Sequence, residues 1–593
     1  MSHFESNMEI VNARFPHISG KKSNNSGSDM EFAVERDIQW LTAIDGIINQ
    51  EGSQFVFVYG FGNGFSLADL LDVFPDKYLF VYEPDEQLFY QSLDEYNLSL
   101  LLNHPHFYWL CVGEDQLKML YYMICTYMHG DINFISLREY LEKDEEILRK
   151  VKNDFQEYKV IFSMSQNTKK RFRLDWTKNY LNNMADILTT PSIEQITNIF
   201  EGITAIVVSS GPSLQDDIEW IKKAHTNTLI IAAGSSIQAL IKNGIHPHLT
   251  VIMDGHSINN TIFSSTESLE SPLLFTSSSY YGISDQKREG KIHSIMKDDA
   301  LSKYLLGIHD DENLLISSTE TVAGTAIQAA VALGASRVIL TGQDLSFPND
   351  KFYADGVEHF GAKDLQGAVK KAQHKVLNVN GTYNITDDSF LIMKYGIENL
   401  IATFPDIEFI NTSRHGVKIE GAPFSPMEEI FDIMNHEDGI SYPVENWLYE
   451  HEKRCFSSDK TAYVKEKLEY MNSDINRMRD EIVALKKKMS KIREYSRTKP
   501  SKGQRVIEEI EQAWGAIANR EWFSPLLETI IPMEVATFDK QLPNIVTEHS
   551  LTIKSDLIYE HLGTLLDAIM NHIPLIQEML DESLLRVNGV RQS

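Results

Sequence analysis

The stretch "AIVVSSGPSLQDDIEWIKKAH", residues 205–225, is the clearest indication of the fold class in this sequence. An apolar run ends in a small, polar turn, and an acidic segment with a helical pattern follows. Glycine permits close backbone approach, proline stiffens the turn, and Ser213 could cap a helix whose first-turn acids Asp216 and Asp217 suit the helix dipole. The turn is therefore either an ordinary capped connection between strand and helix, or a place where backbone N–H groups meet an anionic ligand.

The same alternation repeats downstream, in "NTLIIAAGSS", "PHLTVIMDG", "PLLFTSSSYY", "NLLISS" and "ASRVILTGQDLSF", with helical segments such as "TAIQAAVALG" between the runs. Buried parallel strands with crossover helices are the natural interpretation, and such sheets bind ligands at the carboxyl ends of their strands. We therefore expect the small and polar strand ends to lie along one edge: Ser210, Gly211, Pro212, Ser213, Gly234, Ser235, Asp254, Gln343 and Asp344.

An earlier segment, residues 55–89, reads as strand, glycine-rich turn, helix and strand, which is half of a Rossmann-like unit. Gly60, Gly62 and Gly64 form G-x-G-x-G, and Glu83 ends the second strand, where such folds often hold a ribose hydroxyl. The spacing lacks the last glycine of the dinucleotide fingerprint, so a structural turn is favoured over a cofactor site. Residues 107–113 and 132–137 are predicted as further strands, and residues 140–184 as a helical connector.

The C-terminal part changes to a helical pattern with apolar residues at alternating spacings of four and three. "RTKPSKGQ", residues 497–504, interrupts it, so we predict a helical hairpin or small bundle, packed within the chain in preference to an intermolecular coiled coil. The expected domains are 1–160, 161–441 and 442–593. The residues of the seam are Val464, Leu468, Met471, Ile475, Met478, Ile482, Leu485, Met489 and Ile492.

Composition limits the partners. With 84 acidic and 55 basic residues the formal net charge is -29, which repels nucleic acid and anionic membranes. An anionic small molecule can still bind at a helix terminus or near a few cations. Cys111, Cys125 and Cys455 show neither metal-ligand spacing nor a disulfide framework, and the chain has no long apolar stretch, so we expect a cytoplasmic protein.

Several polar residues are candidates for chemistry. Asp254 precedes glycine at a strand end, where it could accept a sugar hydroxyl or base N–H or bind magnesium, or simply form a turn. Asp344 could cap the next segment or brace its loop. In "SFPNDKFYADGVEHFG", residues 346–361, a lid is predicted in which Tyr353 donates to a leaving phosphate and His359 acts as base; a packed tyrosine and a solvated histidine are the alternative.

Two more candidates follow a later strand. Arg414 and His415 place positive charge at its end, where Arg414 could pair with an anionic donor or form a surface salt bridge. The sequence contains no Walker A loop, no H-E-x-x-H and no Ser-His-Asp elbow. The residues alone therefore predict an α/β protein with an anion or nucleotide site, plus helices.

The motifs "VVSSGPSLQDDIEWI", "IIAAGSSIQALIKNGIHPHLTVIMDG", "GTAIQAAVALGASRVILTGQDLSF", "YADG" and "INTSRHGVKIEGA" together resemble the motility-associated factor (Maf) glycosyltransferases over residues 179–422. The resemblance implies a central Rossmann-like, sialyltransferase-like domain between an N-terminal Rossmann-like domain and a C-terminal helical bundle. It implies transfer of a nonulosonic acid, such as pseudaminic or legionaminic acid, from a CMP-activated donor to Ser or Thr hydroxyls of flagellin, supporting flagellum assembly and motility. No cofactor is required and a divalent metal is optional; a homo-oligomer is conceivable.

The central segment is also similar to bacterial sialyltransferases with a G-N-G-P-S-L loop. Ser210 replaces the loop asparagine, Gly211 to Ser213 match directly, Ser235 lies at the second strand end, and Asp254 replaces an asparagine that reads the nucleotide. Val322 and Ala323 stand where those enzymes have Ser-Gly, which puts sugar contacts there in question. Tyr353 fits a phosphate-clamping tyrosine, and the catalytic base is either His359 or His415. Gly324, Thr325, Gln343, Asp344 and Arg414 complete the predicted donor site.

Two other functions remain open at this point. One is a pyrophosphokinase of the hydroxymethylpterin type, which would need ATP and magnesium. The other is a non-enzymatic flagellin-binding chaperone.

Overall fold

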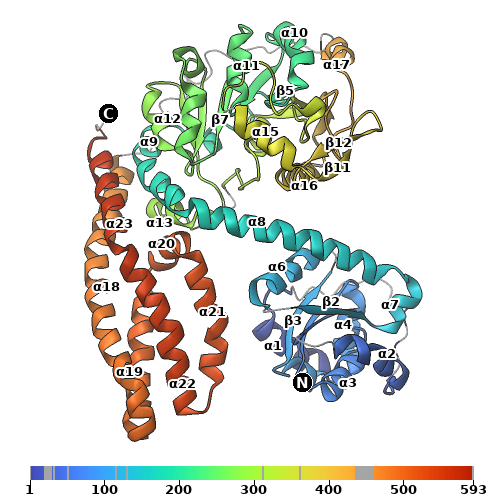
Figure 1. Cartoon of the computed structure of the whole chain (residues 1–593), viewed down its shortest axis with the longest axis vertical. Helices are drawn as coiled ribbons and strands as arrows, with labels where there is room; N and C mark the ends of the chain where they lie inside the picture. The colour runs from blue at the N-terminus through green and yellow to red at the C-terminus, as the bar shows by residue number, and fades with distance from the viewer. Residues whose placement is uncertain are drawn as a thin grey trace. The chain divides into compact units, whose positions relative to one another are not determined.

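The computed structural model describes residues 2–18, 30, 32, 34–49, 53–113, 116–128, 131–309, 313–359, 362–434 and 458–590. The chain forms two compact units, Met1–Lys169 and Lys170–Ser593, which are described separately (Figure 1). The boundary between them lies within the long helix α8 (Ile147–Asn182). The predicted division into three domains stays a prediction, and its second boundary, 441/442, lies outside the described residues.

The first unit is built on a sheet in the order β3-β2-β1-β4, with parallel pairing throughout. Alternate side chains of each strand enter two different cores: Val56 and Val58 join one, while Phe55 and Phe57 join the other. The sheet is therefore covered on both faces. Its strands are β1 (Phe55–Tyr59), β2 (Tyr78–Glu83), β3 (Phe107–Val112) and β4 (Ile132–Ser136).

Helices surround this sheet, and the predicted strand, turn, helix and strand of residues 55–89 are confirmed. The predicted connector is confirmed as α7 followed by α8. The helices are α1 (His3–Arg14), α2 (Ile38–Ile48), α3 (Phe65–Val73), α4 (Glu86–Glu95), α5 (Ser99–Leu102), α6 (Leu117–Tyr127) and α7 (Arg138–Lys143).

The second unit contains a larger parallel sheet, in the order β13-β10-β5-β6-β7-β8-β9 within the described residues. From β5 the chain adds strands in one direction as far as β9, then crosses to the other side of β5 to form β10 and β13, so the topological switch point lies between β5 and β10. The strands are β5 (Ile203–Val208), β6 (Leu229–Ala233), β7 (Leu249–Ile252), β8 (Leu273–Thr276), β9 (Lys291–Ser294), β10 (Ala335–Thr341) and β13 (Glu408–Asn411).

One predicted strand is wrong. Residues 313–318, "NLLISS", form no strand: the Ile316 carbonyl accepts from the Lys297 N–H, and the Ser317 N–H donates to the side-chain oxygen of Gln328 at 2.8 Å. The edge position beside β8 is taken by β9 instead. The polar residues of β9 concealed it in the sequence, although His293 and Ser294 are buried.

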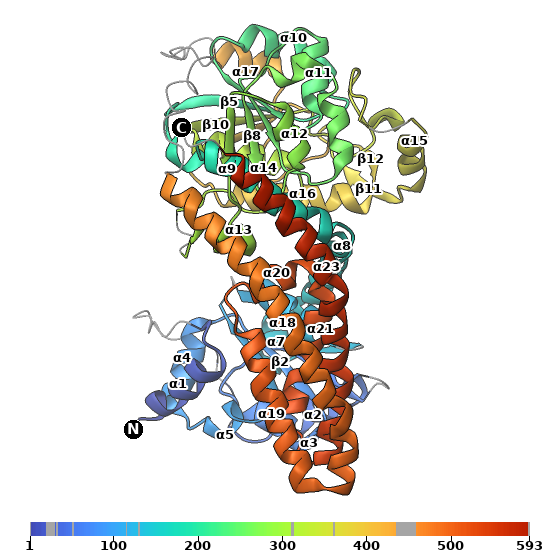
Figure 2. The ribbon, with the colours of Figure 1, turned by 90° about the vertical axis from the view of Figure 1, so that its left-hand side faces the viewer.

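Helices cover both faces of the second sheet (Figure 2), and the predicted helix "TAIQAAVALG" is confirmed within α14. Outside the sheet, β11 (His374–Leu377) and β12 (Tyr383–Thr386) form an antiparallel hairpin. The helices are α9 (Met184–Thr189), α10 (Leu214–Ala224), α11 (Ser236–Lys242), α12 (Tyr281–Gln286), α13 (Ala300–Leu306), α14 (Val322–Ala332), α15 (Ala362–Lys371), α16 (Asp388–Ala402) and α17 (Met427–Met434).

The C-terminal helices belong to the same unit. All nine residues of the predicted seam are buried along α18 (Ser458–Thr498), and they share one continuous core with the helices and strands of the sheet. The predicted packing within the chain is therefore confirmed. The remaining helices are α19 (Pro500–Ala518), α20 (Phe523–Ile530), α21 (Pro532–Thr547), α22 (Leu551–Leu557), a π-helical turn (Ile558–Leu562) and α23 (Gly563–Asn588).

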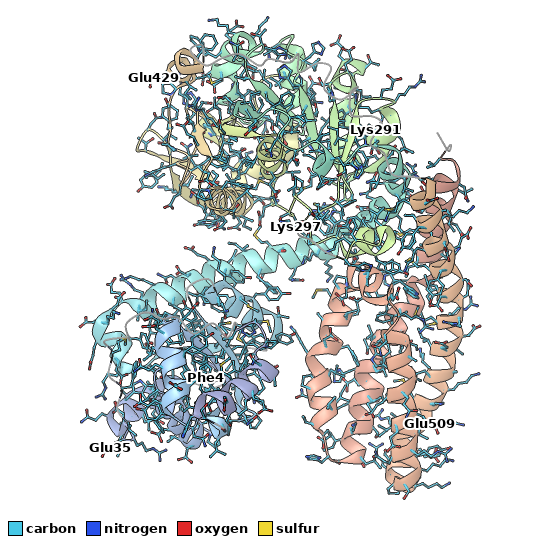
Figure 3. All side chains as sticks on the ribbon, turned by 180° about the vertical axis from the view of Figure 1, so that it is seen from behind. Phe4, Glu35, Lys291, Lys297, Glu429 and Glu509 are labelled. Atoms are coloured by element: carbon cyan, nitrogen blue, oxygen red, sulfur yellow. The ribbon has the colours of Figure 1, made fainter. Side chains whose placement is uncertain are left out.

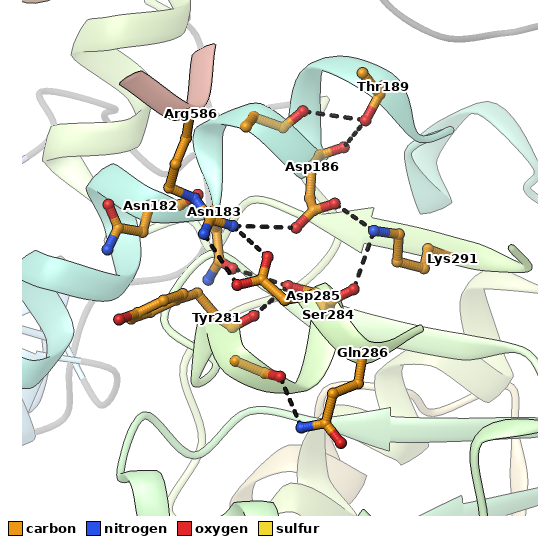
Figure 4. Close-up of polar contacts among 12 residues, drawn as sticks. Asn182, Asn183, Asp186, Thr189, Tyr281, Ser284, Asp285, Gln286, Lys291 and Arg586 are labelled. Atoms are coloured by element: carbon orange, nitrogen blue, oxygen red, sulfur yellow. Dashed lines mark hydrogen bonds and ion pairs between the residues drawn. The ribbon is translucent and has the colours of Figure 1, made fainter. Parts of the chain in front are cut away.

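A polar network also ties α23 to the sheet (Figure 4). Arg586 pairs with Asp285 on α12 and donates to the Asn182 carbonyl at 2.9 Å, while Asp186 on α9 pairs with Lys291 on β9. The outer surface of the helices is charged; Glu509, for example, lies 3.0 Å from Lys488 (Figure 3). Within the described residues, no helix has the length and apolar character needed to cross a membrane.

Candidate functional site

The loops that follow β5 and β10 meet at the switch point of the second sheet. The Gly211 N–H donates to the Gly342 carbonyl at 2.8 Å, and Gly342 has a φ of +63°. A Cβ atom on Gly211 would collide with the Asp344 carboxylate and the Gly342 carbonyl. Glycine is therefore required here for the close approach of two protein loops.

Asp344 occupies the N-terminus of α10. Its carboxylate accepts from the Ser213 N–H at 2.9 Å and from the Ser213 hydroxyl at 2.5 Å, and both side chains are buried. Burial raises the pKa of Asp344 to about 6, against the opposing effect of these hydrogen bonds. The anion at this helix end is thus a side chain of the chain itself, and Asp344 braces the loop after β5.

This arrangement corrects one expectation. Ser213 does not cap α10 with its side chain, because its hydroxyl donates to Asp344 and accepts from the His415 N–H at 2.9 Å. The backbone of Ser213 still provides an N–H for an anion, but that anion is Asp344. Ser213 and Asp344 are brought together as predicted, in a closed network.

Three further predicted residues lie beside this network. Gln343 accepts from the Ser209 hydroxyl at 2.6 Å and is buried. The Nη2 atom of Arg414 donates to both carboxylate oxygens of Glu428 at 2.5 Å, so the salt-bridge alternative describes its conformation here. The His415 Nε2 atom lies 3.3 Å from the Asp216 carboxylate, with 47% of its side chain exposed.

A second group of predicted residues lies on the other side of the β5 loop. The Ser235 hydroxyl donates to the Ser210 hydroxyl at 3.0 Å, and the Ala354 N–H donates to the Ser210 carbonyl at 2.9 Å. The predicted lid therefore contacts the loop that follows β5. A Cβ atom on Gly234, which has a φ of +52°, would lie 3.8 Å from Val322 at the start of α14.

Asp254 and Tyr353 complete this group. The Asp254 side chain is exposed, yet the surrounding protein raises the pKa of its carboxyl by desolvation. The carboxyl is therefore accessible to solvent, while nearby protein disfavours its charged form. Burial is the largest cause that raises the pKa of the Tyr353 phenol, and the charge of Asp254 is the second cause. The two side chains are therefore near one another.

The backbone around Asp254 is firmly held. The Met253 carbonyl accepts from the Ser278 hydroxyl at 3.0 Å, and the Asp254 carbonyl accepts from the Tyr280 N–H at 3.0 Å. The Gly255 carbonyl accepts from the Asn179 side chain at 2.9 Å. Three successive carbonyl groups are therefore fixed by three different partners.

Two buried asparagines that sequence reasoning missed organise the neighbouring loops. Asn179 also donates to the Ser278 carbonyl at 3.0 Å, and Asn183 donates to the carbonyls of Ser277 and Ser279 at 2.9 and 2.8 Å. The signal in the sequence was their spacing: residues four apart on a helix lie on one face. Asn179 and Asn183 link α8 and the start of α9 to the loop after β8.

Gly324 and Thr325 lie in the first turn of α14 and are buried. The Thr325 hydroxyl donates to the sulfur of Met253 at 3.2 Å, and a Cβ atom on Gly324 would collide with Thr319. These two residues support the end of β7 from within.

Aromatic rings of the predicted lid pack together and against α16. The Phe352 ring packs on Phe347, Phe390 and Tyr353, with the Tyr353 centroid 4.6 Å away. His359 Nδ1 lies 3.3 Å from the Thr261 hydroxyl, and burial lowers its pKa. Residues 360 and 361 lie outside the described part of the chain.

The glycine-rich loop of the first unit is closed by the chain's own side chains. Glu83 is fully buried and accepts from the N–H groups of Phe61 and Gly62 at 2.7 and 3.0 Å, and from the Tyr140 hydroxyl at 2.5 Å. The Tyr140 ring covers Gly60. The loop's donors are thus used internally, in agreement with the structural interpretation of this turn.

Comparison with known proteins adds two findings. A protein-family profile described as 6-hydroxymethylpterin diphosphokinase MptE-like matches residues 178–350. Among solved structures, a MAf glycosyltransferase from Magnetospirillum magneticum AMB-1 is 14% identical, with a TM-score of 0.55 over 99% of each chain. The chain resembles a Maf glycosyltransferase in fold along almost its whole length. No curated protein sequence matches it.

The resemblance to Maf glycosyltransferases inferred from the motifs is therefore confirmed, at the level of the fold. The mixed α/β architecture with parallel sheets and many helices is confirmed as well. Within the described residues, no group of three or more His, Cys, Asp or Glu side chains is arranged to hold a metal ion.

Proposed function

We propose that this protein is a cytoplasmic glycosyltransferase of the Maf type, which transfers a nonulosonic acid from a CMP-activated donor to Ser or Thr hydroxyls of flagellin. The observation that carries the proposal is that Ser210, Ser235 and Asp254 follow the ends of β5, β6 and β7, with Tyr353 of the predicted lid near Asp254. These are the positions to which the resemblance assigns donor binding, and sheets of this topology bind ligands at this edge. The transfer needs no cofactor, and a divalent metal is optional.

In this proposal, the hydroxyls of Ser210 and Ser235 hydrogen-bond the nucleotide, and Tyr353 donates to the phosphate as CMP leaves. A negative ligand in a protein with a net charge of -29 needs local compensation. Arg414 supplies it if it exchanges Glu428 for the donor's carboxylate or phosphate. His359 and His415 are candidates for the general base, and Asp216 would orient His415.

Intact-mass analysis of flagellin tests the proposal. Flagellin is co-expressed with this protein and the enzymes that make a CMP-nonulosonic acid, and the matched control lacks only this protein. We expect mass increments of one or more nonulosonic acid residues in the presence of this protein. Unmodified flagellin with a verified supply of CMP-sugar would refute the transferase function.

A pyrophosphokinase is the second candidate, and the matching family profile favours it. It requires ATP, magnesium and a pterin, whereas the transferase requires none of these. Incubating the purified protein with ATP, Mg²⁺ and 6-hydroxymethylpterin, and separately with a CMP-sugar and flagellin, distinguishes the two. Formation of AMP in the first incubation, with no sugar transfer in the second, would establish the pyrophosphokinase.

A flagellin chaperone without catalysis is the third candidate. It predicts flagellin binding with no change in mass. We assign acceptor binding to the first unit and to the C-terminal helices. Because those helices share one core with the sheet, truncation would expose that core, so charge-reversing substitutions of surface residues such as Glu509 are the better test of binding. Size measurement of the same samples decides whether a homo-oligomer forms.

A further inference from the structure

The reaction needs a group that takes the proton of the acceptor hydroxyl. We propose that Asp254, rather than a histidine, is this general base; the inference rests on the proposed function and names a catalytic residue within it. Sequence resemblance alone would place Asp254 in nucleotide recognition, because an asparagine has that role in the similar sialyltransferases.

The geometry of β7 supports this assignment. The three carbonyl groups of residues 253–255 are each held by a hydrogen bond, so the Asp254 Cα position is fixed. Its carboxylate, in contrast, has no hydrogen bond or ion pair within the described part of the chain. A rigid backbone with a free side chain is the arrangement expected of a group whose partner is the substrate.

Two buried carboxylates near this sheet edge, Asp344 and Asp217, already have hydrogen-bond partners. Asp344 accepts two hydrogen bonds from Ser213, and Asp217 accepts from the hydroxyls of Thr341 and Thr412 at 2.7 and 2.5 Å. Both are inaccessible to an incoming hydroxyl, since both are buried. Asp254 differs because it is exposed to solvent at the same edge.

The location of Asp254 also suits the reaction. The Gly234 N–H donates to the Val251 carbonyl at 3.0 Å, which places the end of β7 beside Ser235. On the predicted lid, burial and then the charge of Asp254 raise the pKa of the Tyr353 phenol. Asp254 therefore follows a strand whose end neighbours the Ser235 turn, and its charge acts on the tyrosine proposed to donate to the phosphate.

In the proposed reaction, proton transfer and bond formation occur together. The acceptor hydroxyl gives its proton to the Asp254 carboxylate while its oxygen forms a bond to the anomeric carbon of the sugar. The bond between that carbon and the phosphate oxygen breaks, its electron pair stays with CMP, and the protonated carboxyl later returns its proton to water. Desolvation strengthens Asp254 as a base, and the donor's own negative charges strengthen it further.

The two histidines are held elsewhere. The His415 side chain lies against Asp216, and its backbone N–H donates to the Ser213 hydroxyl. His359 contacts Thr261. Both histidine side chains therefore have protein partners of their own.

Asp254→Asn is the decisive variant, because asparagine retains the shape and can hydrogen-bond a nucleotide but cannot accept the proton. We expect CMP affinity, measured by calorimetry, to change less than about threefold. We expect the rate of flagellin modification, followed by intact mass, to fall about 10²- to 10⁴-fold at saturating donor. Ser235→Ala is the matched binding variant, with weaker CMP binding as its main defect.

Each outcome decides the question. Transfer by Asp254→Asn at a wild-type rate would overturn the base assignment while leaving the proposed function intact. Loss of CMP binding in this variant would return Asp254 to nucleotide recognition. A wild-type protein that transfers nothing refutes the proposed function, and the base assignment with it. Because desolvation disfavours the charged carboxylate in the folded protein, the unfolding midpoint of the variant should equal or exceed that of the wild type at neutral pH.

Discussion

Ser213→Ala tests whether the conspicuous turn of residues 209–213 is a closed structural junction. The hydroxyl of Ser213 donates to the buried Asp344 carboxylate and accepts from the His415 N–H. A hydrogen bond to a charged group contributes about 1.5–3 kcal/mol and a neutral one about 0.5–1.5 kcal/mol. Removing both should lower the free energy of unfolding at pH 7.5 by about 2–4 kcal/mol.

The loss should depend on pH. The Ser213 hydroxyl lowers the pKa of Asp344, which burial raises to about 6, so the variant raises the pKa of the folded carboxyl further. A raised folded pKa destabilises the charged form, and this cost disappears as pH falls through the folded pKa. At pH 5, where Asp344 is mostly protonated, the loss should shrink to about 1–2 kcal/mol.

Guanidinium unfolding followed by tryptophan fluorescence, at pH 7.5 and pH 5, measures both values. The control is Ser210→Ala, whose hydroxyl is half-buried and has a single described partner, Ser235, so it should cost less than about 1 kcal/mol. If Ser213→Ala were no more costly than the control at pH 7.5, or equally costly at both pH values, the closed junction would be disproved.

Other predictions concern stability elsewhere in the second unit. Asn183→Ala leaves two buried carbonyls unpaired and should lower the free energy of unfolding by about 2–4 kcal/mol. The control Thr189→Ala, at an exposed site, should lower it by less than about 1 kcal/mol. Equal losses would contradict the role of the Asn183 amide. Leu468→Ala opens a cavity in the fully buried α18 seam and should cost about 2–5 kcal/mol, with exposed Glu469→Ala as a near-neutral control in the same denaturation assay. Burial raises the pKa of Asp217 to about 6, so this carboxyl binds a proton more tightly in the folded protein than in the unfolded chain. The free energy of unfolding of the wild type should therefore increase by about 1–3 kcal/mol from pH 7.5 to pH 5. Asp217→Asn should reduce that increase.

The periodicity of apolar residues in the sequence predicts much of the secondary structure. Apolar runs between turn residues predicted β5, β6, β7, β8 and β10, because a strand buried on both faces must be apolar throughout. The alternating spacing of four and three predicted the buried face of α18. Periodicity misleads where polarity and burial disagree. β9 is mostly buried although it contains Lys, His and Ser, and the apolar residues 314–316 form no strand.

The order of apolar runs and turns is enough to predict which residues gather at the carboxyl edge of the sheet, because parallel strands place all their C-terminal ends together. Contacts between distant segments then determine which of these residues are available to a ligand. The tertiary structure pairs Ser213 with Asp344 and Arg414 with Glu428, and it leaves the Asp254 carboxylate without a hydrogen-bond partner among the described residues. The physical reason is that hydrogen-bond partners such as Ser213 and Asp344 are distant in sequence, so no local pattern reveals that a buried polar group is already satisfied.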